Sequence, residues 1–315
     1  MLLPSVDSPL LPARHTQEKQ CTLCMDSETS PCDTFGEIKF VRQNSWPENE
    51  KPYVLTYLPN DNFPLTNFDF EDVRNVPIKD MRPIKDELSL DCEGFVVADF
   101  ASALTYDEFF EEEKLRAVFA NELRKFWKDR YGVKAIYIHE CVIRKRDSSP
   151  GKGYGQPVQE AHTGMVVKQL CHESIFSKRT DYTIDYIRQL IPQLVGHNAV
   201  DILARRFQMV NLWKPLRGPL RDWPLAVCDY SSVSSVDMIR VDEVHKEDIL
   251  ESHGVQYSPS QKWYYLSDMK PSEMLIFKAA DSHMEGAVPH SAFKDTRYES
   301  ELPRESIELR VLLVW

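Results

Sequence analysis

The alternation of apolar and polar residues predicts that the second half of the chain is built mainly from short β-strands. Apolar runs bounded by turn residues predict five strands, in the segments FQMVNLW, PLAVCDY, KWYYLSDM, EMLIFKA and ESIELRVLLVW. The turn MKPSE joins two of these strands. Earlier in the chain, PYVLTYL, LDCEGFVVADF and KAIYIHECVIRKR also predict strands, the second of them entered through Gly94.

Two segments have a helical pattern instead. Thr105 and Glu108 form a capping-box pair, and apolar residues recur at helical spacing from Phe109 to Trp127, before a stop at Gly132. The aromatic residues of this stripe are typical of core packing. Residues 181–206 predict further helix, interrupted at Pro192.

This order of elements predicts the fold class. Helices followed by a run of strands argue against a doubly wound parallel sheet. They favour a mainly β fold with flanking helices, an antiparallel jelly-roll or barrel that can hold a ligand at its open end. Residues 1–35 are polar and proline-containing, and we expect a leader that wraps the surface or is partly disordered. Residues 36–315 are expected to form one domain.

Charge and composition narrow the partners. Asp and Glu number 49 against 38 Lys and Arg, giving a net charge of -11, and the chain has no basic tract. Nucleic acid is therefore not an expected partner, because phosphate neutralisation supplies most of that affinity. No apolar run approaches the roughly 18 residues that span a bilayer, and the start MLLPSVDSPLLPARH lacks the apolar core of a signal peptide.

The cysteines say little about the fold or the site. Seven cysteines in 315 residues do not predict a disulfide framework, so we expect a cytoplasmic protein. Cys21 and Cys24 have zinc-ligand spacing, and His15 could add a ligand, but no second Cys-x-x-Cys pair follows. This pattern is a weak indication of zinc.

Histidines and arginines near the strands carry the candidate chemistry. His162 follows a glycine-containing loop, and His290 follows the strand EMLIFKA. Arg304, Ser306, Glu308 and Arg310 alternate, so on a strand they share one face. Two histidines and a carboxylate hold Fe(II) in non-haem oxygenases, and an arginine can bind a dicarboxylate through paired hydrogen bonds. From spacing alone each histidine is more often structural.

Several motifs in sequence order make the chain similar to a known family. They are SLDCEGFVVADFAS, VKAIYIHECVIRKR, GQPVQEAHTG, RFQMVNLWKPLRGPLRDWPLAVCDYSSV, KWYYLSDMKPSEMLIFKAADS and VPHSAFKDTRYESELPRESIELRVLLVW. Over roughly residues 80–315 the chain resembles the fungal hydroxylase/desaturase family of secondary metabolism. That family includes gibberellin desaturase-like proteins and relatives of the bacterial cephalosporin methoxylase component. The resemblance implies a cupin-like double-stranded β-helix and Fe(II)/2-oxoglutarate-dependent oxidation of a small molecule.

The resemblance also implies roles for individual residues. His162 and His290 match the two metal histidines. Arg304 matches the arginine that binds 2-oxoglutarate, with Arg310 as the alternative, and Ser306 completes an Arg-x-Ser pair. Asn211 and Trp213 match a strand that lines the pocket. For Tyr265, Lys278 and Asp281, sheet packing is at least as good an explanation as substrate contact.

The chain departs from the family pattern at Gly164, where relatives place the aspartate of a His-x-Asp motif. The nearest downstream carboxylates, Glu173 and Asp181, lack that spacing. Water could fill the gap in an ordinary hydroxylase, desaturase or ring-forming enzyme. The gap could instead admit chloride, as in the related halogenases, or the glycine could be an engineered change. A further alternative is a noncatalytic subunit, and the expected partners are a small-molecule substrate, a second copy of the chain or a biosynthetic partner enzyme.

Overall fold

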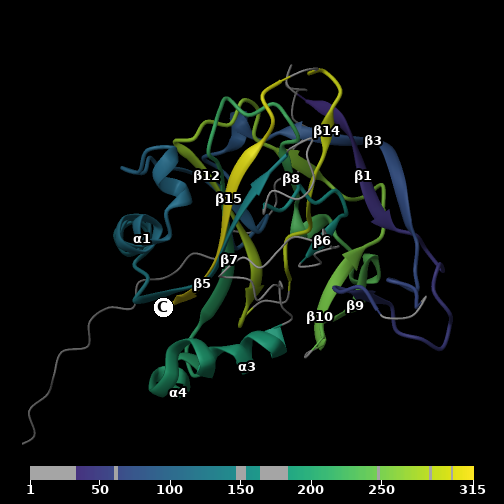
Figure 1. Cartoon of the computed structure of the whole chain (residues 1–315), viewed down its shortest axis with the longest axis horizontal. Coiled ribbons are helices and arrows are strands. Elements are labelled where there is room, and N and C mark those ends of the chain that lie inside the picture. Colours follow the sequence, from purple (N-terminus) through teal and green to yellow (C-terminus); the bar gives the residue numbers. More distant parts are fainter. Residues whose placement is uncertain are drawn as a thin grey trace, which may run out of the picture.

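Two β-sheets and the helices around them make up the computed structural model, which describes residues 33–59, 63–146, 154–163, 184–246, 249–283, 286–298 and 301–315 (Figure 1). The larger sheet has ten strands in the order β14-β1-β3-β11-β8-β13-β6-β10-β9-β2, and the smaller has five in the order β4-β12-β7-β15-β5. Within the described residues, no helix is long and apolar enough to cross a membrane.

The ten-stranded sheet is mainly antiparallel, with parallel pairs between β11 and β3 and between β2 and β9. Its strands are β1 (Thr34–Val41), β2 (Tyr53–Leu55), β3 (Phe70–Asp80), β6 (His162–Thr163), β8 (Leu225–Cys228), β9 (Met238–Val244), β10 (Ile249–Val255), β11 (Trp263–Tyr265), β13 (His290–Ala292) and β14 (Lys294–Asp295). Of these, β1, β3, β9 and β10 are long strands that the sequence pattern did not predict. Because β1 begins at Thr34, the last residues of the predicted leader belong to the sheet.

The five-stranded sheet is antiparallel throughout. It consists of β4 (Phe95–Asp99), β5 (Ala135–Lys145), β7 (Phe207–Pro215), β12 (Glu273–Asp281) and β15 (Glu305–Val314). The sequence predicted all five, since each is an apolar-rich run between turn signals. Gly94 enters β4 with φ of 90°, a left-handed conformation that favours glycine.

The two sheets enclose a shared interior. One core cluster combines Phe95, Trp213, Leu275 and Phe277 of the five-stranded sheet with Val227 and Tyr264 of the ten-stranded sheet. Side chains alternate along each strand, so the neighbours of these residues point outward. On the five-stranded sheet the outward residues pack against the helices that follow β4.

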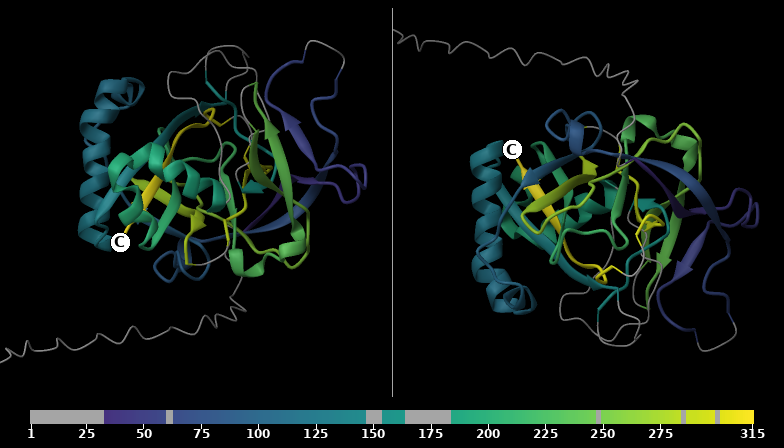
Figure 2. Two further views of the ribbon diagram at one scale, coloured as in Figure 1. Left: turned by 90° about the horizontal axis from the view of Figure 1, so that it is seen from below. Right: turned by 90° about the horizontal axis from the view of Figure 1, so that it is seen from above.

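Those helices differ in detail from the prediction. The predicted capping box forms only in part: the Glu108 carboxylate accepts from the backbone N–H and the hydroxyl of Thr105, but the N-cap of the 3-10 turn at Asp107–Phe110 is Tyr106, which makes no side-chain cap hydrogen bond. Glu111 has an extended backbone, which separates this turn from the helix that follows. The helix continues as α1 (Glu112–Lys114), a π-helical turn (Leu115–Phe119) and α2 (Ala120–Tyr131), which ends at left-handed Gly132 as predicted. Figure 2 shows these helices along the outer side of the five-stranded sheet.

A second helical layer closes one end of the interior. Helices α3 (Ile184–Val195) and α4 (Ala199–Leu203) pack against Met209, Leu312 and neighbouring residues of β7, β12 and β15. Pro192 lies inside α3, so the predicted interruption there is wrong: the helix continues to Val195. A proline this close to the helix end removes only one hydrogen bond of the last turn.

The cysteines also depart from expectation. Among the described residues, Cys92 is disulfide-bonded, whereas Cys141 and Cys228 carry free thiols. One disulfide does not make a disulfide framework. Its presence nevertheless means that the cysteines no longer support the expectation of a reducing compartment. The possible zinc ligands His15, Cys21 and Cys24 lie outside the described residues.

Candidate active site

Two histidines lie side by side on neighbouring strands of the ten-stranded sheet. His162 on β6 and His290 on β13 are Cα partners in the antiparallel register, and their ring centroids are 4.2 Å apart. His290 also pairs with Val227, whose side chain belongs to the core between the sheets. Paired residues share a face, so both imidazoles point into the interior, where each residue is only 4% exposed. The structure thus brings together the two predicted histidines.

Backbone carbonyls fix the orientation of both rings. The Nδ1 atom of His162 lies 2.6 Å from the carbonyl oxygen of Glu160, and that of His290 lies 3.1 Å from the carbonyl oxygen of Val288. Because a carbonyl can only accept, these contacts assign the proton to Nδ1 and the lone pair to Nε2 in each ring. This is the tautomer that a metal-ligating histidine needs, and the carbonyl is its usual outer partner.

The two imidazoles fit part of an iron site. They supply two of the three protein ligands of a 2-His-1-carboxylate centre. Within the described residues, no group of three or more His, Cys, Asp or Glu side chains is arranged to hold a metal ion. Gly164, the position from which the carboxylate is missing in the sequence, lies outside the described residues.

Arg304 is a buried cation with neutral partners. It is 2% exposed, and its guanidinium donates from Nη1 to the carbonyl oxygen of Trp223 at 2.7 Å and from Nε to Ser306 Oγ at 3.2 Å. Its Cζ atom lies 4.9 Å from the centroid of the Trp213 ring. No carboxylate of the described residues forms an ion pair with this guanidinium.

The electrostatics of Arg304 favour an anionic ligand. Burial, together with the nearby positive charge of Arg144, lowers the pKa of the Arg304 guanidinium to about 9. The group is therefore still charged at neutral pH, although its surroundings disfavour the charge. A carboxylate bound at Arg304 would compensate that charge through strong, charge-assisted hydrogen bonds.

Arg310 lies in a different environment. It is 5% exposed and donates from Nη1 to Oε2 of buried Glu140 on β5, its Cα partner in the sheet. A charge already neutralised by a carboxylate has little electrostatic reason to bind a second one. The alternative prediction, with Arg310 as the residue that binds 2-oxoglutarate, therefore loses its physical basis.

The remaining predicted pocket residues fall into two groups. Asn211 pairs with Phe277 and Arg310, and Trp213 pairs with Glu308, so both face the interior as expected. Phe277 also contacts the His290 ring, with centroids 4.7 Å apart, which places Asn211 in the same layer as the histidines.

Three late-strand residues have structural roles, as the sheet-packing explanation predicted. Tyr265 belongs to the core on the other face of the ten-stranded sheet, where its hydroxyl accepts from Arg297. Of the two explanations left open for Tyr265, the structure therefore favours sheet packing over substrate contact, because strand alternation directs its side chain away from the interior. Lys278 and Asp281 pair with each other at 3.4 Å, and Asp281 also accepts from Arg206.

Some interior residues escaped prediction. Glu140 and Arg144 on β5 face inward, and Arg144 lies 3.9 Å from Glu308. Charged residues at alternate positions of an apolar strand were the available signal, in the run IHECVIRKR. Asp222 and Trp223, which contact Arg304, lie in the loop between β7 and β8 and had no sequence signal.

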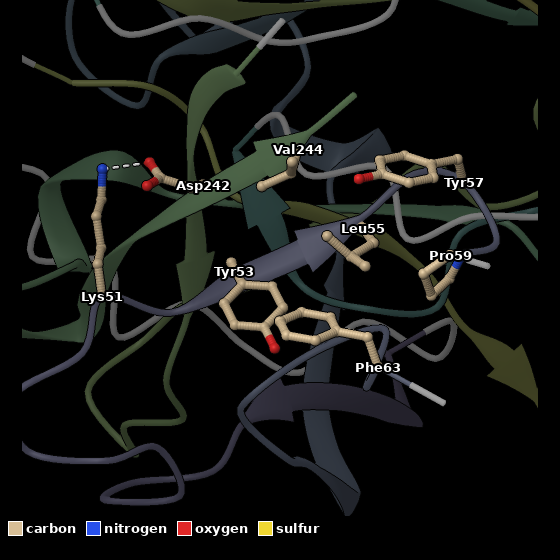
Figure 3. Close-up of a pocket in the computed structure, with 8 residues that line it drawn as sticks. All are labelled: Lys51, Tyr53, Leu55, Tyr57, Pro59, Phe63, Asp242 and Val244. Atoms are coloured by element: carbon tan, nitrogen blue, oxygen red, sulfur yellow. Dashed lines mark hydrogen bonds and ion pairs between the residues drawn. The ribbon is translucent and has the colours of Figure 1, made fainter. Parts of the chain in front are cut away.

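A surface pocket of about 520 Å³ lies elsewhere, at the edge of the ten-stranded sheet (Figure 3). Tyr53 and Phe63 stack in it with ring centroids 5.9 Å apart, and Lys51 pairs with Asp242 at its polar end. The register from β2 through β9 and β10 to β6 places Tyr53 and Asp242 on the face opposite His162. The pocket is therefore separate from the histidine pair.

Known proteins are similar to this chain over most of its length. The family described as "Oxidoreductase/YMDC permease-like domain" matches residues 38–314. The Fe(II)/2-oxoglutarate-dependent dioxygenase nvfI of Aspergillus novofumigatus is 28% identical over 289 residues, which cover 88% of this chain and 95% of that protein. The hydroxylase/desaturase efuI of Hormonema carpetanum is 27% identical over 254 residues, covering 76% of this chain and 83% of that protein.

A solved structure extends the similarity to three dimensions. The iron and alpha-ketoglutarate-dependent endoperoxidase NvfI superposes with a TM-score of 0.76 at 26% identity, over 90% of this chain and 99% of that one. The chain belongs to the family of fungal Fe(II)/2-oxoglutarate-dependent dioxygenases and hydroxylase/desaturases of secondary metabolism.

Proposed function

We propose that this protein catalyses the Fe(II)/2-oxoglutarate-dependent oxidation of a small-molecule secondary metabolite, by hydroxylation, desaturation or ring formation. One observation carries the proposal: the interior holds two adjacent histidines in the metal-binding tautomer, together with a buried arginine whose guanidinium has only neutral hydrogen-bond partners among the described residues. A noncatalytic subunit would have no need for either feature.

The architecture supports a finer description of the fold. We propose that the facing sheets form a cupin-like double-stranded β-helix, with residues 36–315 as one domain. Support comes from the antiparallel five-stranded sheet, from its shared core with the larger sheet, and from the histidines on the inner face. In such folds the ligand site lies between the sheets.

Each residue then has a distinct task. His162 and His290 would hold Fe(II) through Nε2, while the carbonyl groups of Glu160 and Val288 keep their rings oriented. Arg304 would bind the distal carboxylate of 2-oxoglutarate, with Ser306 beside it. Bound Fe(II), with 2-oxoglutarate and dioxygen, supplies the oxidising chemistry, and the chain supplies orientation and a dry interior.

Metal binding tests the histidine assignment. Protein mixed with Fe(II) and 2-oxoglutarate without oxygen should show the weak visible charge-transfer band of the chelate. His162→Ala or His290→Ala should abolish the band and lower iron affinity, since each removes a ligand. His253→Ala is a matched control, because His253 on β10 pairs with Thr163 of β6, so its side chain lies on the face of the sheet opposite His162.

The outcomes separate the assignments. A band that persists in both alanine variants at positions 162 and 290 would show that other residues bind the metal. A band lost equally in His253→Ala would show that the sheet, rather than the ligand set, had been damaged. Equilibrium metal binding, measured in parallel, gives a readout that does not depend on turnover.

Halogenation remains a second candidate because Gly164 stands in place of a carboxylate. Neither nvfI nor efuI is named a halogenase, so this candidate and its chloride cofactor rest on the glycine alone. Gly164→Asp restores a carboxylate and should strengthen iron binding while excluding a halide. Mass spectrometry of products formed with and without chloride or bromide would decide. Products that contain no halogen at saturating halide would exclude halogenation and leave oxidation without halogen as the function.

The partners are also proposals. We propose that the enzyme acts on a small molecule and does not bind nucleic acid, in keeping with its net charge of -11. The expectation of a cytoplasmic location is not supported by the cysteine content, because Cys92 is disulfide-bonded. A homodimer or a complex with another biosynthetic enzyme would be visible as a concentration-dependent change of mass in solution.

A further inference from the structure

Trp223 has a backbone conformation that its sequence disfavours. Its φ is 47°, in the left-handed region, although tryptophan is bulky and the next residue is Pro224. Bulky residues rarely adopt this region, and a residue before proline is normally extended. Such strain persists only where the surrounding structure enforces it, and it often marks a functional position.

The strained residue holds the guanidinium of Arg304. The carbonyl oxygen of Trp223 accepts a hydrogen bond from Arg304 Nη1 at 2.7 Å. This contact fixes one edge of the guanidinium, while Ser306 holds Nε and the Trp213 ring lies beside Cζ. Within the described residues Nη2 donates no hydrogen bond, so that edge of the guanidinium is the one left to bind a ligand.

The preceding residue holds the backbone of the same arginine. Asp222 Oδ2 accepts from the Arg304 backbone N–H at 2.7 Å and from Arg146 Nε at 2.5 Å. The backbone N–H of Arg146 in turn donates to the Arg304 carbonyl oxygen at 2.8 Å. Asp222 therefore ties the start of β15 to the end of β5, directly at the residue whose side chain must be aimed.

We propose that Asp222 and Trp223 are positioning residues that aim Arg304 at the distal carboxylate of a bound 2-oxo acid. The two residues act on one arginine at two points, its backbone and its guanidinium, from a single loop. This inference rests on the proposed function, because it assumes that Arg304 binds the cosubstrate. Their contribution is to hold the arginine in place before the ligand arrives, which reduces the ordering cost of binding.

Substitutions at Trp223 distinguish a backbone role from a packing role. Glycine adopts the left-handed conformation without strain and keeps the carbonyl in place, whereas β-branched valine opposes it. We expect Trp223→Gly to retain the dissociation constant for 2-oxoglutarate and Trp223→Val to raise it about tenfold. If the side chain matters only for packing, glycine should be the worse of the two, and that order would overturn the proposal.

Substitutions at Asp222 provide the second part of the test. Asp222→Ala should raise the 2-oxoglutarate dissociation constant about tenfold, whereas Asp222→Asn should rescue most of the affinity because its amide oxygen still accepts from Arg304. Binding is measured by calorimetry on the full chain with Fe(II) in the absence of oxygen. Equal weakening by asparagine and alanine would show that the hydrogen bond to the Arg304 backbone is not what matters.

A ligand without the distal carboxylate distinguishes loss of Arg304 positioning from general damage to the binding site. 2-Oxobutyrate keeps the metal-binding keto acid but lacks the distal carboxylate, so its affinity should be the same in all four variants. A parallel loss of 2-oxobutyrate binding would overturn the proposal. Arg304→Ala identifies failure of the proposed function: if it leaves 2-oxoglutarate binding intact, the anchor itself is wrong. If only Arg304→Ala weakens binding, the anchor stands and the positioning role fails.

Discussion

The two faces of the five-stranded sheet use the same strands for opposite purposes. The outer face carries Ile307, Leu309 and Val311 of β15, which pack with α2 in a continuous apolar core. The inner face of that strand carries Ser306, Glu308 and Arg310, and Arg304 precedes them. The outer face of β15 is therefore apolar core, whereas its inner face carries polar and charged residues, among them the candidate chemistry. The period of two along a strand allows both in a single run of residues.

The inner face itself contains two unlike arginines. Arg310 has a buried carboxylate partner, whereas Arg304 has neutral ones. A paired buried charge belongs to the folded structure, and a buried charge without a carboxylate is suited to a ligand. Burial alone, 5% and 2% exposed, does not separate the two residues; the partners do.

The largest effect should come from breaking the paired arginine. Arg310→Ala leaves Glu140 buried without its cation, which should lower the free energy of unfolding by about 3–5 kcal/mol. Urea unfolding followed by circular dichroism measures this. The double variant Arg310→Met with Glu140→Leu should recover much of the loss, and failure to recover it would mean that packing, rather than charge, explains the effect.

Truncation on the outer face should follow closely. Ile307 is fully buried against the helices, and Ile307→Ala should destabilise the protein by about 2–4 kcal/mol through lost burial and a residual cavity. Its affinity for 2-oxoglutarate should be unchanged in the folded protein. A large change of affinity with little loss of stability would contradict the division of labour between the faces.

Arg304→Ala should show the reverse pattern. We expect the dissociation constant for 2-oxoglutarate to rise about 100-fold, or about 2.7 kcal/mol, because a buried charge-assisted contact is lost. Stability should change little, since no described carboxylate loses its partner. Arg310→Ala is the comparison, and an equal or larger loss of affinity there would transfer the anchoring role to Arg310.

Lys214 is the exception on the outer face and gives the smallest expected effect. It is 2% exposed, with Nζ 5.4 Å from the ring centroids of both Phe100 and Phe109. Burial lowers its pKa from 10.5 to about 8. The unfolded chain therefore binds more protons between these two values, so stability should rise as pH increases from about 8 to 10.5.

Lys214→Met should remove that pH dependence and stabilise the protein at neutral pH by about 2 kcal/mol. The difference between wild type and variant across this pH range isolates the lysine from the other groups that titrate there. A variant less stable than wild type at neutral pH would show that attraction between the cation and the aromatic rings outweighs the cost of burying the charge.

Much of the five-stranded sheet and part of the site could be predicted from sequence. Its strands are apolar runs between turn signals, and the alternation after Arg304 correctly placed Ser306, Glu308 and Arg310 on one face. Both interior histidines were identified mainly through family resemblance. By contrast, β3 and β9 mix charged and apolar residues without a clear period, and a local pattern gave them no signal.

A register shift in β5 shows a limit of pattern alone. Ile136 and Ile138 face the helices together with Cys141 and Ile143, although their positions differ in parity. The sheet absorbs this through an irregularity between Arg310 and Val311 in the pairing of β15 with β5. Strict alternation would have placed either Ile136 and Ile138 or Cys141 and Ile143 in the interior.

What the sequence determined was the set of chemical groups and the faces on which nearby residues lie, because side-chain alternation is local. What only the tertiary structure decided was which groups meet. His162 reaches His290 through strand pairing across the sheet, and Arg310 meets Glu140 in the same way. Arg304 is held by Trp223, whose left-handed backbone no local rule predicts. Long-range pairing sets these partners, and the partners determine whether a buried charge stabilises the fold or awaits a ligand.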